Sequence, residues 1–121
     1  MTNHEIATGL VNLCKEGKYH EAIETYYADH CVSVESMTQG DTPRETVGKP
    51  AILARSDWFI GAHEIHSMVI EGPFVSPEYF AVIFRMDATF KPTGHRSHVS
   101  EVALYTVADG KVVRDEFLMA S

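Results

Sequence analysis

Glu101 is the ionisable residue whose sequence surroundings most strongly suggest chemistry. It lies in a stretch with β-strand alternation, where it shares a face with Val99, Ala103 and Tyr105. A carboxyl group among apolar neighbours has a raised pKa and can serve as a general acid, a general base or a protonated hydrogen-bond donor. The same pattern also allows a structural ion pair between Glu101 and Arg85 on the preceding strand, and the sequence leaves both roles open.

A second carboxyl group, Asp115, lies in a later predicted strand on the same face as Phe117. If that face points inward, Asp115 joins Glu101 in a site of two carboxylates, one of them protonated. A slip of one residue would expose Asp115 to solvent and turn Glu116 inward, and of the two arrangements we expect the solvated Asp115. Asp87, on the long preceding strand, has the same ambiguity and is a further candidate to line the site.

The histidines suggest proton transfer rather than metal binding. His63 and His66 are three residues apart in a predicted strand, so they point to opposite faces and do not bind one ion together. We therefore predict no metal site. His66 is a candidate proton shuttle and His63 a candidate residue of a pocket wall, and the alternative for each is a hydrogen-bonded structural histidine.

Three aromatic residues are candidates to line a pocket. Tyr105 shares the face of Glu101, Tyr26 lies on a predicted helix, and Trp58 lies beside the apolar stripe of another helix. The alternative for an aromatic residue at helical spacing is a place in the core. The sequence contains no phosphate-binding loop, dinucleotide fingerprint or nucleophile motif, so we expect no cofactor.

Charge and composition exclude several classes of partner. The 121 residues carry 17 acidic and 10 basic side chains, a net charge of −7, and no basic run, so we expect neither nucleic acid nor a membrane surface as partner. No signal peptide or membrane-spanning stretch is evident, and Cys14 and Cys31 form no disulfide pattern. These features predict a cytoplasmic protein with a small-molecule ligand.

The N-terminal half has the periodicity of amphipathic helices. Thr2 and Glu5 form a capping box before a first helix, which Gly17 ends. A second helix begins at Tyr19, with apolar residues spaced i, i+3, i+4, i+7 and i+8 as far as Tyr27. We expect Tyr27 to lie in the core.

A loop separates these helices from a third. After a short β-like run over residues 31–35, the polar segment 36–49 predicts a long loop, of the kind that often forms a lid or mouth. Pro50 suits the first turn of a third helix, which ends near Gly61.

The periodicity then changes to that of β-strands. Gly72-Pro73 is expected to end the first of these strands, and Asp109-Gly110 is a strong hairpin signal before the last. Helices followed by consecutive antiparallel strands predict a single α+β domain over residues 1–121. The predicted strands are residues 65–70, 79–90, 96–107 and 111–119.

One strand also predicts an assembly. Residues 79–84 are apolar on both faces, although a sheet with one solvated face should alternate. Three helices cover only one face, so we expect a homodimer in which a second copy covers the other.

These elements and their motifs resemble the SnoaL-like domain proteins of the nuclear transport factor 2-like superfamily, which includes ketosteroid isomerase. The resemblance implies a cone-shaped, curved antiparallel sheet closed by three N-terminal helices, an α+β barrel with an apolar pocket inside. Its members include polyketide cyclases, dehydratases, epoxide hydrolases and non-catalytic binding domains. The resembling segments are residues 17–23, 27–35, 48–52, 63–67, 80–82, 101–105 and 109–113.

The resemblance to the isomerases is only partial at the catalytic positions. In that family a tyrosine on the first helix and an acidic residue on a long strand bind the developing oxyanion, and an aspartate at the end of the first strand is the base. Leu10 takes the tyrosine position, Ser36 takes the base position with Glu35 beside it, and Glu101 matches the acidic residue in type. The resemblance therefore disfavours steroid isomerisation by that mechanism and leaves an ionisable group in an apolar cone.

The sequence as a whole predicts a small protein that binds a small, mostly apolar ligand in an internal pocket. If it is an enzyme, we expect cofactor-independent proton transfer of the isomerase, cyclase, dehydratase or hydrolase type, with Glu101 as acid or base and Asp115 or His66 in support. The alternative is a non-catalytic ligand-binding or dimerisation module, which a Glu101–Arg85 ion pair would favour.

Overall fold

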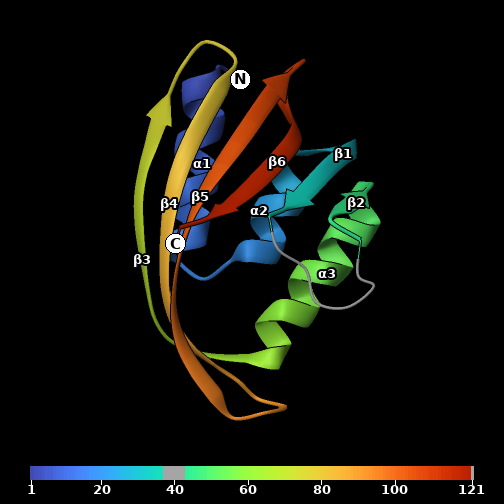
Figure 1. Cartoon of the computed structure of the whole chain (residues 1–121). Helices are drawn as coiled ribbons and strands as arrows, with labels where there is room; N and C mark the ends of the chain where they lie inside the picture. Colours follow the sequence, from blue (N-terminus) through green and yellow to red (C-terminus); the bar gives the residue numbers. More distant parts are fainter. Residues whose placement is uncertain (37–42, 121) are drawn as a thin grey trace.

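The computed structural model describes residues 1–36 and 43–120, and these form three helices and six strands (Figure 1). The segment 37–42, in the loop expected to form a mouth, lies outside the described residues. The helices are α1 (Asn3–Lys15), α2 (Tyr19–Tyr26) and α3 (Lys49–Ala62). The strands are β1 (Tyr27–Glu35), β2 (Glu45–Val47), β3 (His63–Val75), β4 (Tyr79–Phe90), β5 (His95–Ala108) and β6 (Lys111–Met119).

The strands form one curved sheet in the order β2-β1-β6-β5-β4-β3, with the helices on its concave side (Figure 1). Three details of the expected cone differ in the structure. The sheet of the described residues is open, with β2 and β3 at its edges, and β1 runs parallel to β6. Only α1 and α2 precede the strands, because α3 follows β2. The α3 helix packs against both β1 and β3, so it bridges the two sides of the open sheet.

The start of the chain folds largely as its sequence predicts. Glu5 donates its backbone N–H to Thr2 Oγ1 at 3.1 Å, and the backbone N–H of Thr2 donates to Glu5 Oε1 at 3.0 Å, which confirms the capping box. Gly17 follows α1 with a φ of +76°, a conformation that glycine adopts at little cost. The expected second helix is one residue too long, because Tyr27 begins β1.

The strands differ from expectation mainly at Gly72-Pro73. We expected this pair to end a strand, but β3 continues to Val75 through a register shift between Glu71 and Phe74. Gly72 has a φ of +117°, which a residue with a side chain rarely adopts. The predicted hairpin at Asp109-Gly110 is present, and both residues have positive φ, as a two-residue turn of this type requires.

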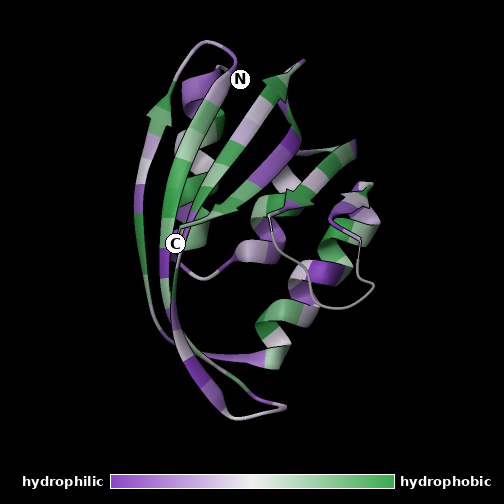
Figure 2. Ribbon diagram, in the orientation of Figure 1, coloured by the Kyte–Doolittle hydropathy of each residue, from purple (hydrophilic) through white to green (hydrophobic). Residues whose placement is uncertain are grey.

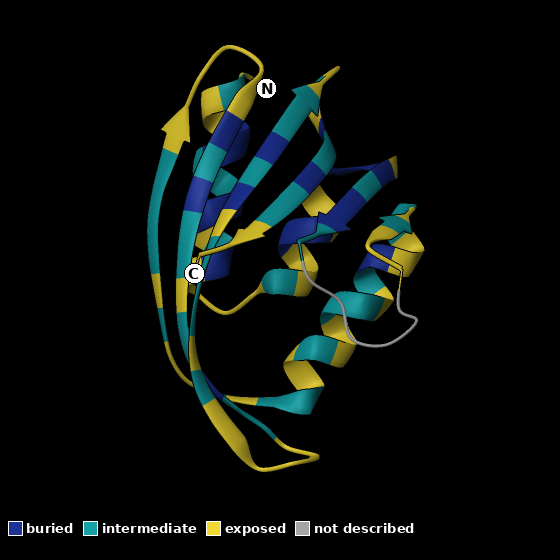
Figure 3. Cartoon of the chain, viewed as in Figure 1, coloured by how far each residue is buried: buried dark blue, intermediate teal, exposed yellow. Residues whose placement is uncertain are grey.

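The core fills one end of the concave face. Hydrophobic residues occupy the middle of β4 and β5 (Figure 2), and the fully buried ones gather beside α1 and α2 (Figure 3). Towards the turn between β4 and β5 the strands are mostly exposed or half-buried, and Ile52 is the one buried residue of α3. None of the described helices is long and apolar enough to cross a membrane. The centre of the core consists of Ile6, Leu10, Val11, Phe80, Val82, Ala103, Tyr105 and Val112.

Candidate functional site

A pocket of about 160 Å³ lies on the concave face, between the helices and the middle of the sheet. Its wall is mostly apolar, with Leu10, Cys14, Ala22, Ile23, Phe59 and Ile60 from the helices and Met68, Phe84, Met86, Val99 and Phe117 from the strands. Its polar side chains are Tyr19, Tyr27, Ser56, Glu101 and Tyr105. No Lys, Arg or His is among these lining residues, so the pocket suits a ligand without negative charge.

Glu101 is the carboxyl group in this wall. Strand alternation on β5 puts it on the inner face, directly across from Phe84 on β4. Burial, together with the negative charge of Glu35, raises the pKa of Glu101 to about 7. The alternative ion pair with Arg85 does not form, because Arg85 faces outward and donates to Glu71 Oε1 at 2.8 Å. Glu101 therefore faces the pocket with no basic side chain in ion-pair distance among the described residues.

Asp115 lies beneath the pocket wall, and our expectation that it is solvated is wrong. Its exposed fraction is 1%, and its carboxylate accepts a hydrogen bond from the hydroxyl of Tyr27, whose ring lines the pocket. Burial raises the pKa of Asp115 to about 6, although the hydroxyls of Ser33 and Tyr27 act in the opposite direction. The strand did not slip, and Glu116 faces outward, 3.5 Å from Arg114 Nη2.

A third carboxyl group, Glu35, stands beside these two. The parallel register pairs Glu35 with Phe117, which places it on the inner face at the end of β1. Burial raises the pKa of Glu35, and the guanidinium of Arg55, 4.0 Å away, lowers it. Arg55 also donates to Thr46 Oγ1 at 2.7 Å, and it is not among the residues that line the pocket.

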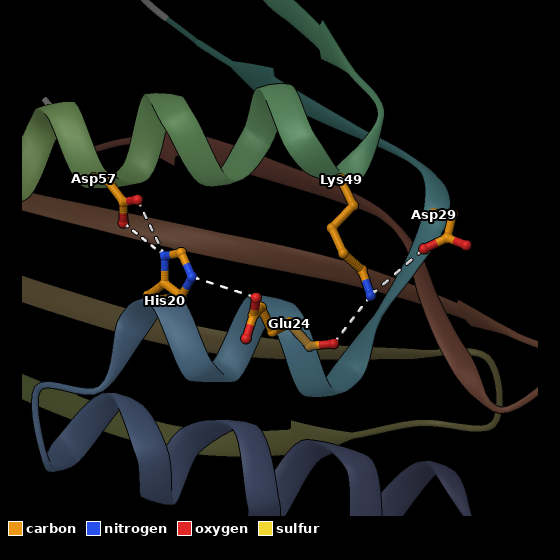
Figure 4. Close-up of polar contacts among 5 residues, drawn as sticks. All are labelled: His20, Glu24, Asp29, Lys49 and Asp57. Carbon is orange, nitrogen blue, oxygen red and sulfur yellow. Dashed lines mark hydrogen bonds and ion pairs between the residues drawn. The ribbon is translucent and has the colours of Figure 1, made fainter.

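Polar contacts join α2 and α3 outside the pocket (Figure 4). The imidazole Nδ1 of His20 lies 2.9 Å from Asp57 Oδ1, and its Nε2 lies 3.5 Å from Glu24 Oε1. Lys49 donates to the backbone carbonyl of Glu24 at 3.0 Å and lies 3.7 Å from Asp29 Oδ1. These contacts hold together the two helices whose inner sides line the pocket.

The structure places both candidate histidines outside the pocket lining. His66 Nε2 lies 2.8 Å from Thr89 Oγ1 on the exposed part of the sheet. His63 donates from Nδ1 to the carbonyl of Phe59 at 2.8 Å and stacks on the Phe59 ring, with 4.1 Å between ring centroids. His63 therefore supports a pocket residue without lining the pocket itself. Residues 1–36 and 43–120 contain no group of three His, Cys, Asp or Glu side chains that could hold a metal ion.

Tyr105 lines the pocket, whereas three other candidates do not. Trp58 is 60% exposed and contacts the edge of Phe90, because α3 turns Phe59 and Ile60 inward instead. Tyr26 packs its hydroxyl over Gly9 of α1. Asp87 faces outward and accepts two hydrogen bonds from the guanidinium of Arg96, at 2.9 and 2.8 Å, which hold its pKa below the usual value.

The residue that sequence reasoning missed is Tyr27. It lies in the core, as we expected, but it begins a strand instead of extending the helical stripe, and it joins the pocket to Asp115. Its partner is 88 residues away, so no local spacing indicates the pair. The apolar wall residues Met68, Met86 and Phe117 were missed for the same reason.

Comparisons with known proteins agree with this architecture. The family model described as a SnoaL-like domain matches residues 1–119. A solved structure of a proposed SnoaL-like polyketide cyclase from Mesorhizobium loti is 39% identical, with 97% of this chain and 98% of that chain covered and a TM-score of 0.90.

Two more distant structures show the fold alone. A proposed isomerase from Bacillus subtilis is 18% identical over 99% of this chain and 90% of that chain, with a TM-score of 0.77. A Xanthomonas campestris protein of unknown function with a cystatin-like fold is 14% identical over 100% and 92%, with a TM-score of 0.79. No curated protein matches the chain. The match along nearly its whole length shows that the chain belongs to the SnoaL-like domain family.

Proposed function

We propose that this protein binds a small, mostly apolar molecule in its pocket and catalyses cofactor-independent proton transfer on it, with Glu101 as the acid or base. The observation that carries this proposal is the position of Glu101. Its carboxyl group lines an apolar pocket, and burial raises its pKa to about 7. A general acid or base works best when its pKa is near the operating pH, so Glu101 suits proton transfer at neutral pH.

The size and charge of the pocket support a small ligand without negative charge. An engineered cavity of about 150 Å³ in another protein binds benzene, so a pocket of about 160 Å³ suits a ligand built on one small ring. An anionic ligand would meet Glu101 and no lining cation. The reaction class is of the isomerase, cyclase, dehydratase or hydrolase type, and the names of the Mesorhizobium and Bacillus proteins fall in this range.

The test is a Glu101→Gln variant, assayed for binding and for turnover with a panel of small cyclic ketones, alcohols and epoxides. Binding is followed by ligand-observed NMR and turnover by NMR of the products. We expect binding to persist and turnover to fall by roughly 100-fold or more, the usual contribution of a positioned acid or base. Glu116→Gln, on the outer face of the same sheet, is the matched control. Unchanged turnover in Glu101→Gln would remove Glu101 from the mechanism, and binding without turnover in the wild type would favour the non-catalytic module.

We also propose that two copies pair through the convex face of the sheet. One row across four strands joins Glu71, Ile83, Val102 and Leu118, and the last two are exposed apolar side chains. Glu71 at the end of this row forms an ion pair with Arg85, so a two-fold related copy can present opposite charges to this pair.

Light scattering tests the pairing. We expect a dimer of the wild type at micromolar concentration and a monomer of Val102→Glu, because a buried unpaired carboxylate opposes association. Val47→Glu, on the exposed edge strand β2, is the control and should leave the dimer intact. A monomeric wild type would contradict the proposal.

A further inference from the structure

Glu101 and Tyr105, both in the pocket wall, lack a polar partner among the described residues. Glu101 forms no ion pair or hydrogen bond with these residues, and no basic side chain lowers its pKa. The hydroxyl of Tyr105 has no hydrogen-bond partner among them either, although the exposed fraction of this residue is only 2%. Buried polar groups are normally hydrogen-bonded, so the two side chains indicate a ligand with a polar part.

Aromatic rings flank the Glu101 carboxyl group on both neighbouring strands. Phe84 lies directly across from Glu101 on β4. Phe117 lies on β6 across from Ala103, so it is diagonal to Glu101 on the same face, and both rings line the pocket. Side chains at opposed and diagonal positions of an antiparallel sheet reach one another. Because aromatic rings attract cations, a cation bound to Glu101 gains from the rings on either side.

The charges around the pocket are unbalanced. The negative charge of Glu35 raises the pKa of Glu101, and Asp115 lies beneath the wall. Among the described residues, Arg55 is the one basic side chain that lowers the pKa of any of these carboxyl groups. It acts on Glu35 and Asp115 but not on Glu101. A buried carboxylate needs a partner of opposite charge, and a cationic ligand supplies one to Glu101.

We propose that the ligand of the pocket is a small alkyl amine with a hydrocarbon ring, whose ammonium group binds the Glu101 carboxylate between Phe84 and Phe117. This inference rests on the proposed function for the place of the ligand and deepens it by naming the ligand class. Primary alkyl amines resemble the lysine side chain, which has a pKa of about 10.4 in water, so they are cationic at neutral pH. The apolar part of the wall, with Met68 and Met86, holds the ring.

Binding of an ammonium group is linked to the protonation of Glu101. When Glu101 is protonated, the ammonium displaces the carboxyl proton, which passes to solvent; when Glu101 is ionised, no proton moves. Burial has already removed much of the hydration of Glu101, so its attraction for an ammonium exceeds that of a solvated carboxylate. The titratable and charged groups around it, from α1, α2, α3, β1, β5 and β6, are Cys14, Tyr19, Arg55, Tyr27, Glu35, Tyr105 and Asp115.

The experiment measures the affinities of cyclohexylamine, cyclohexanol and cyclohexanone by ligand-observed NMR titration, from about pH 5.5 to about pH 8.5. The three compounds have a six-membered ring and a similar size, and only the amine is charged. The variant is Glu101→Gln, and Glu116→Gln on the outer face is the matched control. This control also reports the general attraction of a cation to a protein with a net charge of −7.

We expect the wild type to bind cyclohexylamine at least about tenfold more tightly than cyclohexanol at about pH 8, because hydrogen bonds to charged groups are stronger than neutral ones. Below about pH 7, where Glu101 is protonated, the affinity for the amine should fall by up to about tenfold per pH unit. The affinities for the neutral compounds should change little. Glu101→Gln should abolish the preference for the amine and retain the neutral ligands, whereas Glu116→Gln should keep the preference within about twofold.

The outcomes separate this inference from the proposed function. Equal affinities for cyclohexylamine and cyclohexanol, a preference that survives in Glu101→Gln, or equal losses in Glu101→Gln and Glu116→Gln overturn the amine and leave the proposed function. Tight binding of the amine without turnover of any ligand supports the amine and contradicts the catalytic part of the proposed function. Failure of these three compounds and of the wider panel to bind overturns both. If Glu101→Gln does not fold, a wild-type affinity for the amine that does not vary with pH still overturns the inference.

Discussion

The surroundings of the carboxyl groups differ between the two faces of the sheet. On the convex face, Asp87 is bound by the Arg96 guanidinium and its pKa is lowered, and Glu71 is paired with Arg85. On the concave face, Glu101 and Asp115 are buried, and their pKa values are raised to about 7 and about 6. Both sets belong to the same sheet, with Glu71 and Asp87 on β3 and β4 and Glu101 and Asp115 on β5 and β6, and their side chains leave it on opposite sides. The direction of the pKa shift of these carboxyl groups therefore depends on the face to which strand alternation directs them and not on the acidic composition.

The largest expected contrast between the faces is in packing. Phe80→Ala on the concave face, where the side chain has no exposed area and stacks on Tyr105, should lower the free energy of unfolding by about 3–5 kcal/mol. Ile83→Ala on the convex face should cost clearly less, because that side chain is only half-buried in one copy of the chain. Urea denaturation of both variants at the same protein concentration measures the difference. Equal losses would mean that the convex face is packed as tightly as the core.

The next contrast is the dependence of stability on pH. Because the folded-state pKa of Glu101 is about 7, above the unfolded value near 4.5, the charged form opposes folding. The stability that the fold keeps while Glu101 is protonated is fully present below about pH 4.5, declines as the pH rises, and is lost above about pH 7. Glu101→Gln should therefore be more stable than the wild type by about 3 kcal/mol at pH 8 and equal to it at pH 4, as read from urea denaturation. A difference that does not vary with pH would show that Glu101 titrates normally.

Blocking the pocket should have a smaller effect, confined to ligand binding. Ser56→Phe places a ring at a position that lines the pocket, so it should weaken binding of cyclohexanone by at least about tenfold, or roughly 1.4 kcal/mol. Ser100→Phe, on the convex face across from Arg85, is the control. NMR titration of both variants gives the affinities, and equal affinities would place the ligand elsewhere.

The smallest effect should come from Asp87, with the opposite sign to Glu101. Its folded-state pKa is lowered, so its ion pair stabilises the fold above the unfolded value of 3.8, and this contribution is lost as the pH falls through the folded-state pKa. Asp87→Asn should be slightly less stable than the wild type at pH 7 and no different in strong acid, in matched thermal melts. An Asp87→Asn variant that is more stable than the wild type at pH 7 would show that the carboxylate on the convex face does not stabilise the fold.

Local signals predicted most of the elements, because each depends on neighbouring residues. The Thr2–Glu5 capping box and the Asp109-Gly110 hairpin are present as expected. The end of α2 and the continuation of β3 past Gly72 were missed, since pairing with a neighbouring strand overrides the helical periodicity at Tyr27 and the stop signal at Gly72.

The site was harder to predict than the fold. Alternation within one strand was enough to place Glu101 on the same face as Tyr105, which lines the pocket with it. The burial of Asp115 depends on the neighbouring strand β1, whose parallel pairing with β6 no local pattern reveals. The side chains of Trp58 and Asp87 were misplaced because their directions follow from the packing of α3 and from Arg96, respectively.

The position of β6 between β1 and β5 has a consequence for biosynthesis. β1 is made early, but its long partner in the sheet is β6, and β2 on its other side is only three residues long. While the ribosome is still adding residues before 111, the inner edge of β1 has no strand beside it and the Tyr27 hydroxyl has no carboxylate to bind. The part of the pocket wall that contains Tyr27 and Phe117 is therefore completed only after β6 has emerged. A nascent chain that lacks β6 should expose an unpaired edge of β1 to chaperones.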